Sequence, residues 1–130
     1  MVKKSWKNMY YNSLRNLGVY SFLEGLSNII YWFKIIWNDR QWDYYYFLVI
    51  IRAKLNRMIK YREHSPNFME YEGHNIDLER MKTTYKAVDR LVKDNYLIEY
   101  DKYEKAVEER KNDYKILFES LREHLPGWWD

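Results

Sequence analysis

Apolar residues recur at helical spacing along two stretches of the first half of the chain. The first stretch, from about Tyr20 to Trp37, has an apolar residue at every third or fourth position, at Phe22, Leu26, Ile29, Phe33 and Ile36. The second ends near Arg62 and shows the same pattern at Tyr44, Leu48, Ile51, Leu55 and Met58. Because an α-helix has about 3.6 residues per turn, each set lies on one face and predicts an amphipathic helix.

Two more long helices are predicted after a polar segment. Residues 63–74 contain Pro66 and Gly73 and are expected to form a connecting loop. The stripe of the third helix is Leu78, Met81, Tyr85, Val88 and Val92, and that of the fourth is Tyr103, Val107, Tyr114, Leu117, Leu121 and Leu125. A shorter apolar pattern over residues 5–17 predicts a helical arm, residues 1–18, that ends at Gly18.

These elements predict one all-α domain over residues 1–130. It is expected to be an antiparallel bundle of about four long helices, with the N-terminal helical arm and a C-terminal tail, residues 126–130.

Polar residues at the predicted helix starts indicate how each helix begins. Asp39 is expected to cap the second helix, with Asp43 adding negative charge to its first turn. Asn75 is the expected cap of the third helix. Asp101, followed by Glu104, resembles a capping box at the fourth.

Composition removes several classes of site. The chain has no Cys, which excludes disulfides, thiolate zinc sites and cysteine nucleophiles and fits a cytosolic protein. The most apolar window, Val19–Trp37, contains Glu24 and Lys34, so no membrane span is expected. The first residues also lack the apolar core and cleavage site of a secretory signal.

Aromatic residues exceed what a core of this size needs. The chain has 6 Trp, 14 Tyr and 5 Phe, and many lie between Tyr31 and Phe47. The excess predicts a recognition surface or a contact with another copy, and we expect a homo-oligomer. The predicted interface residues are Trp32, Ile35, Trp37, Phe47, Trp128 and Trp129. The Trp128-Trp129 pair is expected to pack into a groove of its own or a neighbouring subunit.

Basic residues are concentrated in the first half of the chain. Residues 1–62 hold 11 Lys/Arg against 3 Asp/Glu, a net charge of +8, whereas residues 63–130 hold 11 against 16, a net charge of −5. A basic face on the second helix, extending to Lys60 and Arg62, follows a group of aromatic residues. Rings that stack on a base and cations that hold phosphates could bind a nucleotide or nucleic acid. The candidate ligand-binding residues are Trp42, Tyr45, Tyr46, Arg52, Lys54 and Arg57. Alternatively, these cations form a solvated helix surface that pairs with the acidic second half.

No pattern in the sequence indicates catalysis. There is no nucleophile elbow, no Gly-rich phosphate loop and no paired helical His motif. His64 and His74 bracket a loop with Glu63, Glu70 and Glu72, but the set matches no known ligand spacing. We therefore predict no metal, no cofactor and no catalytic residue, and an enzyme is the function class with least support.

Three segments together resemble a known group of proteins. They are IIWNDRQWDYYYFLVIIRAKLNRM, ERMK followed by AVDRLVKDNY, and LREHLPGWWD. Over roughly residues 29–130 they are similar to small uncharacterised proteins of tailed bacteriophages. The resemblance implies a phage accessory protein in the host bacterial cytoplasm, and it carries over no site residue.

Small phage accessory proteins often resemble anti-defence factors. The expected function is therefore non-catalytic binding, either sequestering a nucleotide signal or blocking a host protein. The alternatives are a structural or virion-associated helical oligomer and a nucleic-acid-binding protein.

Overall fold

The structure is a computed structural model that describes residues 18–64 and 73–128. Within these residues all regular structure is helical, which confirms the all-α fold predicted from periodicity. Contacts divide the chain into two units, Met1–Asp39 and Arg40–Asp130. The helix predicted over residues 5–17 and the Trp129 side chain lie outside the described residues.

The first unit contains the long helix α2, Val19–Ile36. It follows Gly18, whose φ of 72° lies in the left-handed region that favours glycine. The predicted bounds, Tyr20 to Trp37, are correct to within one residue at each end. The residues of its predicted stripe form one apolar face, and each is between 44% and 69% exposed.

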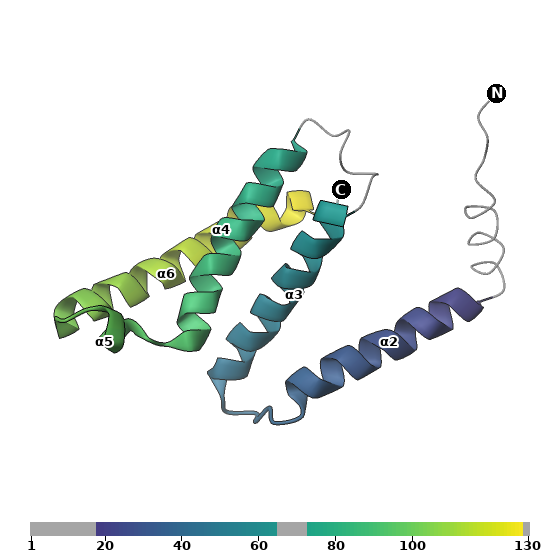
Figure 1. Ribbon diagram of the computed structural model, residues 1–130, viewed down its shortest axis with the longest axis horizontal. Coiled ribbons are helices and arrows are strands. Elements are labelled where there is room, and N and C mark those ends of the chain that lie inside the picture. Colours follow the sequence, from purple (N-terminus) through teal and green to yellow (C-terminus); the bar gives the residue numbers. More distant parts are fainter. Residues whose placement is uncertain (1–17, 65–72, 129–130) are drawn as a thin grey trace. The chain divides into compact units, whose positions relative to one another are not determined.

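The second unit is built from three long helices (Figure 1). They are α3, Tyr44–His64, α4, His74–Lys93, and α6, Tyr103–His124. The short helix α5, Tyr96–Glu99, joins α4 to α6, and a 3-10 turn, η2, Leu125–Trp128, follows α6. Helix α4 contacts both α3 and α6 and runs antiparallel to each. Arg62 and Arg52 of α3 pair with Asp77 and Asp89 of α4. Ser120 and Asp113 of α6 bond to Thr84 and Arg90 of α4.

The predicted stripes of these three helices meet in one core. Met81, Val88 and Leu117 are fully enclosed, with Leu48 and Leu55 of α3 packed against them. The four stripes are each expected to be core, and this is wrong at Tyr44 and Tyr103, the first stripe residues of α3 and α6, and along the stripe of α2, because all of these residues are exposed. Helical spacing identifies a face but not the point along the helix where the neighbouring helix ends.

The helix starts differ from the predicted ones. The Asp43 carboxylate accepts the backbone N–H of Tyr45 at 2.9 Å, so Asp43, not Asp39, caps α3. Helix α4 starts one residue before Asn75 and has Gly73 at the N-cap position, while Lys102 occupies that of α6. Neither position has a side-chain cap hydrogen bond, so the predictions for Asn75 and Asp101 are wrong.

The C-terminal turn closes the second unit. Trp128 is 3% exposed and lies in the core, so of the two placements expected for it the structure has the intramolecular one. Its carbonyl accepts a hydrogen bond from Arg62 at 2.8 Å. Arg62 is itself 3% exposed and lies 3.6 Å from Asp77, so it does not belong to a solvated basic face as predicted. The Trp128 carbonyl satisfies Nη2, whereas Nη1 makes no hydrogen bond within the described residues and is balanced by the charge of Asp77.

None of the helices in residues 18–64 and 73–128 is both long and apolar enough to span a membrane.

Candidate functional site

The predicted ligand-binding residues on α3 do not face one direction. Each residue of an α-helix is rotated about 100° from the previous one. Tyr45 and Arg52, seven residues apart, therefore lie on the same side of the helix. Lys54 is rotated about 200° from Arg52 and lies on the opposite side, with Arg57 next to it. One small ligand therefore cannot contact both groups of cations at once.

The basic residues of α3 also have partners within the chain. Arg52 donates to the Asp89 carboxylate at 3.2 Å, and the same carboxylate lies 2.6 Å from the Lys93 ammonium. Lys54 and Arg57 take part in interactions as well. Arg52, from the basic first half of the chain, therefore pairs with an acidic residue of the second half, as the alternative interpretation of these cations predicts.

Three aromatic side chains are strongly exposed at the start of α3. Trp42 is 83%, Tyr44 66% and Phe47 57% exposed, and we call this group the α3 aromatic surface. Tyr44 and Phe47 are three residues apart and so are neighbours on the helix. Phe47 is followed at intervals of seven by Lys54 and then by Tyr61, which is also exposed, so the exposed side continues for about 21 Å along α3.

The other predicted interface residues have different environments. Trp37, one residue after α2, is exposed, and Trp32 and Ile35 within α2 are half-buried. The Tyr45 and Tyr46 rings contact each other edge to face, with centroids 5.4 Å apart. Of the predicted set, Phe47 and Trp37 thus offer the most open apolar surface, and Trp128 offers none.

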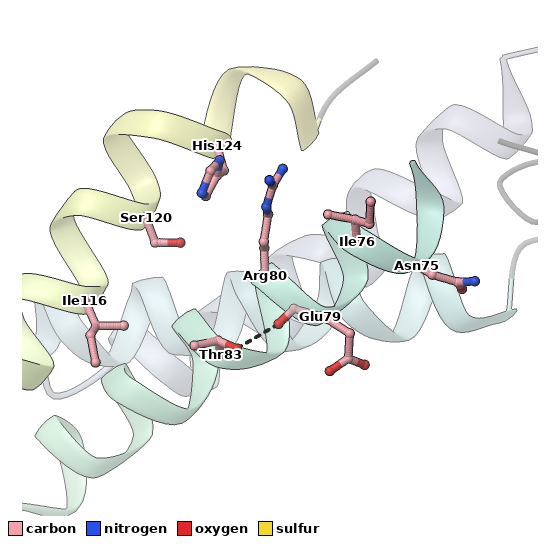
Figure 2. A pocket seen from close by; sticks show the side chains of 8 residues that line it. All are labelled: Asn75, Ile76, Glu79, Arg80, Thr83, Ile116, Ser120 and His124. Atoms are coloured by element: carbon pink, nitrogen blue, oxygen red, sulfur yellow. Dashed lines mark hydrogen bonds between the residues drawn. The ribbon is translucent and has the colours of Figure 1, made fainter. Parts of the chain in front are cut away.

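A groove that periodicity did not reveal lies between α4 and α6 (Figure 2). Its volume is about 570 Å³, within the usual range for small-ligand sites. The lining residues come from the first half of α4 and the last half of α6, and they are Asn75, Ile76, Glu79, Arg80, Thr83, Ile116, Ser120 and His124. Helical spacing places the lining residues of α4 on one face of that helix and those of α6 on one face of the other. Which two faces oppose each other depends on the tertiary packing.

The polar groups of the groove come from both of its walls. Figure 2 shows the Arg80 and His124 side chains projecting from opposite helices into the space between α4 and α6. Arg80 lies 3.6 Å from Asp77, and His124 Nε2 lies 4.0 Å from Glu123, both longer than a normal hydrogen bond. Ile76 and Ile116 supply apolar wall. The groove can therefore hold a molecule with an anionic end and an apolar body.

A buried carboxylate organises the link between α4 and α6. Asp113 is 1% exposed and accepts hydrogen bonds from Arg90 Nε at 2.8 Å, from Arg90 Nη2 and from the Tyr96 hydroxyl. The bond to Asp113 raises the pKa of Arg90. Burial, and then the bond to Asp113, raises the pKa of Tyr96. These three side chains hold α4, α5 and α6 together, and we assign them a structural role.

Within the described residues no group of three or more His, Asp or Glu side chains is arranged to hold a metal ion. His64 donates through Nδ1 to the Lys60 carbonyl at 2.7 Å, and His74 is buried at the start of α4. Glu70 and Glu72 lie outside the described residues.

Neither a scan against models of known protein families nor searches of curated proteins and of solved structures found a match to this chain. The resemblance to small tailed-phage proteins therefore stays an expectation, and the function rests on the geometry of the site.

Proposed function

We propose that this chain is a non-catalytic binding protein that docks on a host protein through the α3 aromatic surface. Following the phage resemblance, the proposed setting is the bacterial cytoplasm and the proposed role is the blocking of a defence factor. The observation that carries the proposal is the exposure of Trp42, Tyr44 and Phe47. Trp and Tyr are enriched among the few residues that carry most of the binding energy of protein interfaces.

The shape of the surface favours a protein partner over a nucleotide. From Phe47 the exposed side of α3 continues for about 21 Å to Tyr61. A surface of this length suits a groove or a helix of another protein. Arg52 is paired with Asp89, and Lys54 lies on the other side of the helix. Arg52 and Lys54 therefore cannot both hold the phosphates of one nucleotide on α3.

A pair of double variants tests the proposal. Trp42→Ala/Phe47→Ala removes two anchors, while Leu97→Ala/Ile98→Ala removes two equally exposed apolar side chains from α5 and serves as the control. Each is expressed in a phage-sensitive bacterium, co-purified proteins are quantified by mass spectrometry, and phage plating is measured on a strain with an active defence system.

We expect one bacterial protein to be recovered at fixed stoichiometry with wild type and control. Its recovery should fall about tenfold or more with the α3 variant. Replacing one interface anchor of this type by Ala costs about 2 kcal/mol of binding free energy. The plating advantage should fall with it. Equal recovery from all three proteins, or no stoichiometric protein at all, contradicts the proposal.

The groove between α4 and α6 supports a second candidate, the sequestration of a small nucleotide signal. Arg80 and His124 can meet a phosphate, and the volume of about 570 Å³ suits a small ligand. Calorimetry against cyclic nucleotides and short oligonucleotides tests it, with Arg80→Gln as the variant and Lys86→Gln, exposed elsewhere on α4, as the control. Binding that depends on Arg80 supports sequestration, whereas binding that weakens steeply with salt but not with Arg80→Gln supports a nucleic-acid role.

A structural or virion-associated oligomer remains the alternative if neither experiment yields a ligand. Such a role needs only contacts between copies of the chain.

A further inference from the structure

The apolar face of α2 has the spacing of a two-helix seam. Its members follow one another at intervals of three, four, three, four and three residues, and they are Val19, Phe22, Leu26, Ile29, Phe33 and Ile36. We call this set the α2 seam. All six side chains are between 44% and 69% exposed. A seven-residue repeat with apolar residues at these two positions is the pattern by which paired helices pack knobs into holes.

The residues beside the α2 seam are uncharged. On one side lie Leu23, Ile30 and Trp37, all exposed, and on the other lie Gly25 and Trp32. The two charged residues of α2, Glu24 and Lys34, lie away from the seam on the polar side of the helix. A second copy of α2 therefore meets no charge repulsion at the seam or at its flanks.

The exposed area is large enough for a stable contact. Nine large apolar side chains of α2 and its C-terminal cap present on the order of 1,000 Å², against about 800 Å² per partner in a standard interface. An isolated helix of 18 residues is also marginally stable in water, so pairing would stabilise it.

Charge decides the orientation of the pairing. Residues 1–17 contain Lys3, Lys4, Lys7 and Arg15 and no acidic residue. Parallel helices would bring the starts of both α2 helices, where these basic segments join, to the same end, whereas antiparallel helices separate the two starts by the helix length of about 27 Å. That distance exceeds the screening length of about 8 Å at physiological salt, so an antiparallel pair is favoured.

An antiparallel register also uses every seam residue. Val19 faces Ile36 of the partner subunit, Phe22 faces Phe33 of the partner subunit, and Leu26 faces Ile29 of the partner subunit. We propose that two copies of this chain associate through an antiparallel contact between their α2 seams. The proposal is independent of the proposed function, because α2 contributes no residue to the α3 aromatic surface.

Disulfide trapping tests the register. Because the chain has no Cys, a disulfide can form only between the introduced residues. Val19→Cys and Ile36→Cys are purified separately, mixed in equal amounts and oxidised. We expect the mixed disulfide between positions 19 and 36 to dominate over both homodimers, because like positions lie at opposite ends of the pair. Ser27→Cys, on the polar side, gives the background level of random collision. Efficient cross-linking of Val19→Cys with itself overturns the antiparallel register.

Sedimentation equilibrium tests the association itself. Ile29→Glu buries an unpaired charge in the seam and is expected to raise the dimer dissociation constant at least about 100-fold. Ser27→Glu, on the polar side, should leave the constant unchanged, and circular dichroism should show α3, α4 and α6 intact in both. A wild-type chain that stays monomeric at every concentration, the result expected if the seam is covered within one copy, overturns the proposal. Equal constants for wild type and Ile29→Glu overturn it as well.

Discussion

Arg62 Nη2 donates a hydrogen bond to the main-chain carbonyl of Trp128 at 2.8 Å, which ties the end of α3 to the turn that follows α6. The two residues are 66 positions apart in the sequence, and both are buried. This bond and the ion pair with Asp77 place a guanidinium, normally a surface group, among the side chains that close one end of the second unit.

The first prediction follows from that burial. Arg62→Ala leaves the buried Trp128 carbonyl without its donor, removes one of the two guanidinium groups near Asp77 and opens buried space, and is expected to cost about 3–5 kcal/mol of unfolding free energy. Arg80→Ala is the matched control, because Arg80 also lies 3.6 Å from Asp77 but is exposed, and it should cost less than about 1 kcal/mol. Urea unfolding monitored by circular dichroism measures both. Similar losses for the two variants would show that burial does not set the strength of this pair.

A second prediction compares two tryptophans. Trp128→Ala opens a cavity in the core and is expected to destabilise the second unit by about 3–5 kcal/mol. Trp42→Ala, at an exposed position, should change stability by no more than about 0.5 kcal/mol. Thermal and urea unfolding of both variants provide the check. A large loss for Trp42→Ala would mean that this ring is covered in the folded protein and would weaken the proposed docking surface.

A third prediction concerns the Tyr96 hydroxyl. Its pKa in the folded protein is raised above the ordinary value of 10.0, because burial and the bond to Asp113 both disfavour the phenolate. Folding therefore favours the protonated hydroxyl. The contribution of this hydroxyl to the unfolding free energy is fully present below about pH 10 and is lost as the pH rises further.

Tyr96→Phe removes this dependence along with the hydrogen bond. At pH 8 the variant is expected to be less stable than wild type by about 1–2 kcal/mol. The difference should shrink when unfolding is measured above pH 10. Tyr103→Phe, at an exposed position, controls for the titration of the other tyrosines. A gap between wild type and Tyr96→Phe that is constant with pH would contradict the assignment.

The fourth prediction tests which aspartate caps α3. Asp43→Ala removes the acceptor of the Tyr45 N–H and is expected to cost about 1 kcal/mol. Asp39 lies outside the helix, so Asp39→Ala should cost less than half of the unfolding free energy lost in Asp43→Ala. The measurement is the unfolding free energy of each variant. A larger loss of unfolding free energy for Asp39→Ala than for Asp43→Ala would show that Asp39 caps α3, as the sequence predicts.

Periodicity is sufficient to predict the four long helices and the central core residues of α3, α4 and α6, such as Leu55, Met81 and Leu117, because a stripe that buries its side chains must repeat with the helix. Leu48, Leu55 and Arg62 follow one another at intervals of seven and share a buried face. This spacing is a signal for the burial of Arg62, but the charge of an arginine favours a ligand-binding or solvated face, because burial of an arginine requires partners. Those partners, Asp77 and Trp128, come from distant parts of the chain and are visible only in the fold.

The candidate sites were harder to predict for the same reason. Residue types between 42 and 57 indicate recognition, but the rotation of α3 places Tyr45 with Arg52 on one side and Phe47 with Lys54 on the other. The groove of Arg80 and His124 depends on two helices whose facing sides are fixed by core contacts such as Val88 with Leu117. No local pattern in either helix encodes that pairing.

Helix α4 supplies packing surface to both α3 and α6, so these two outer helices rely on one shared element for their order. Loss of α4 exposes the inner faces of both at the same time. The second unit is therefore expected to melt as one cooperative body, with equal calorimetric and van't Hoff enthalpies, and with its slowest-exchanging amides along the middle of α4.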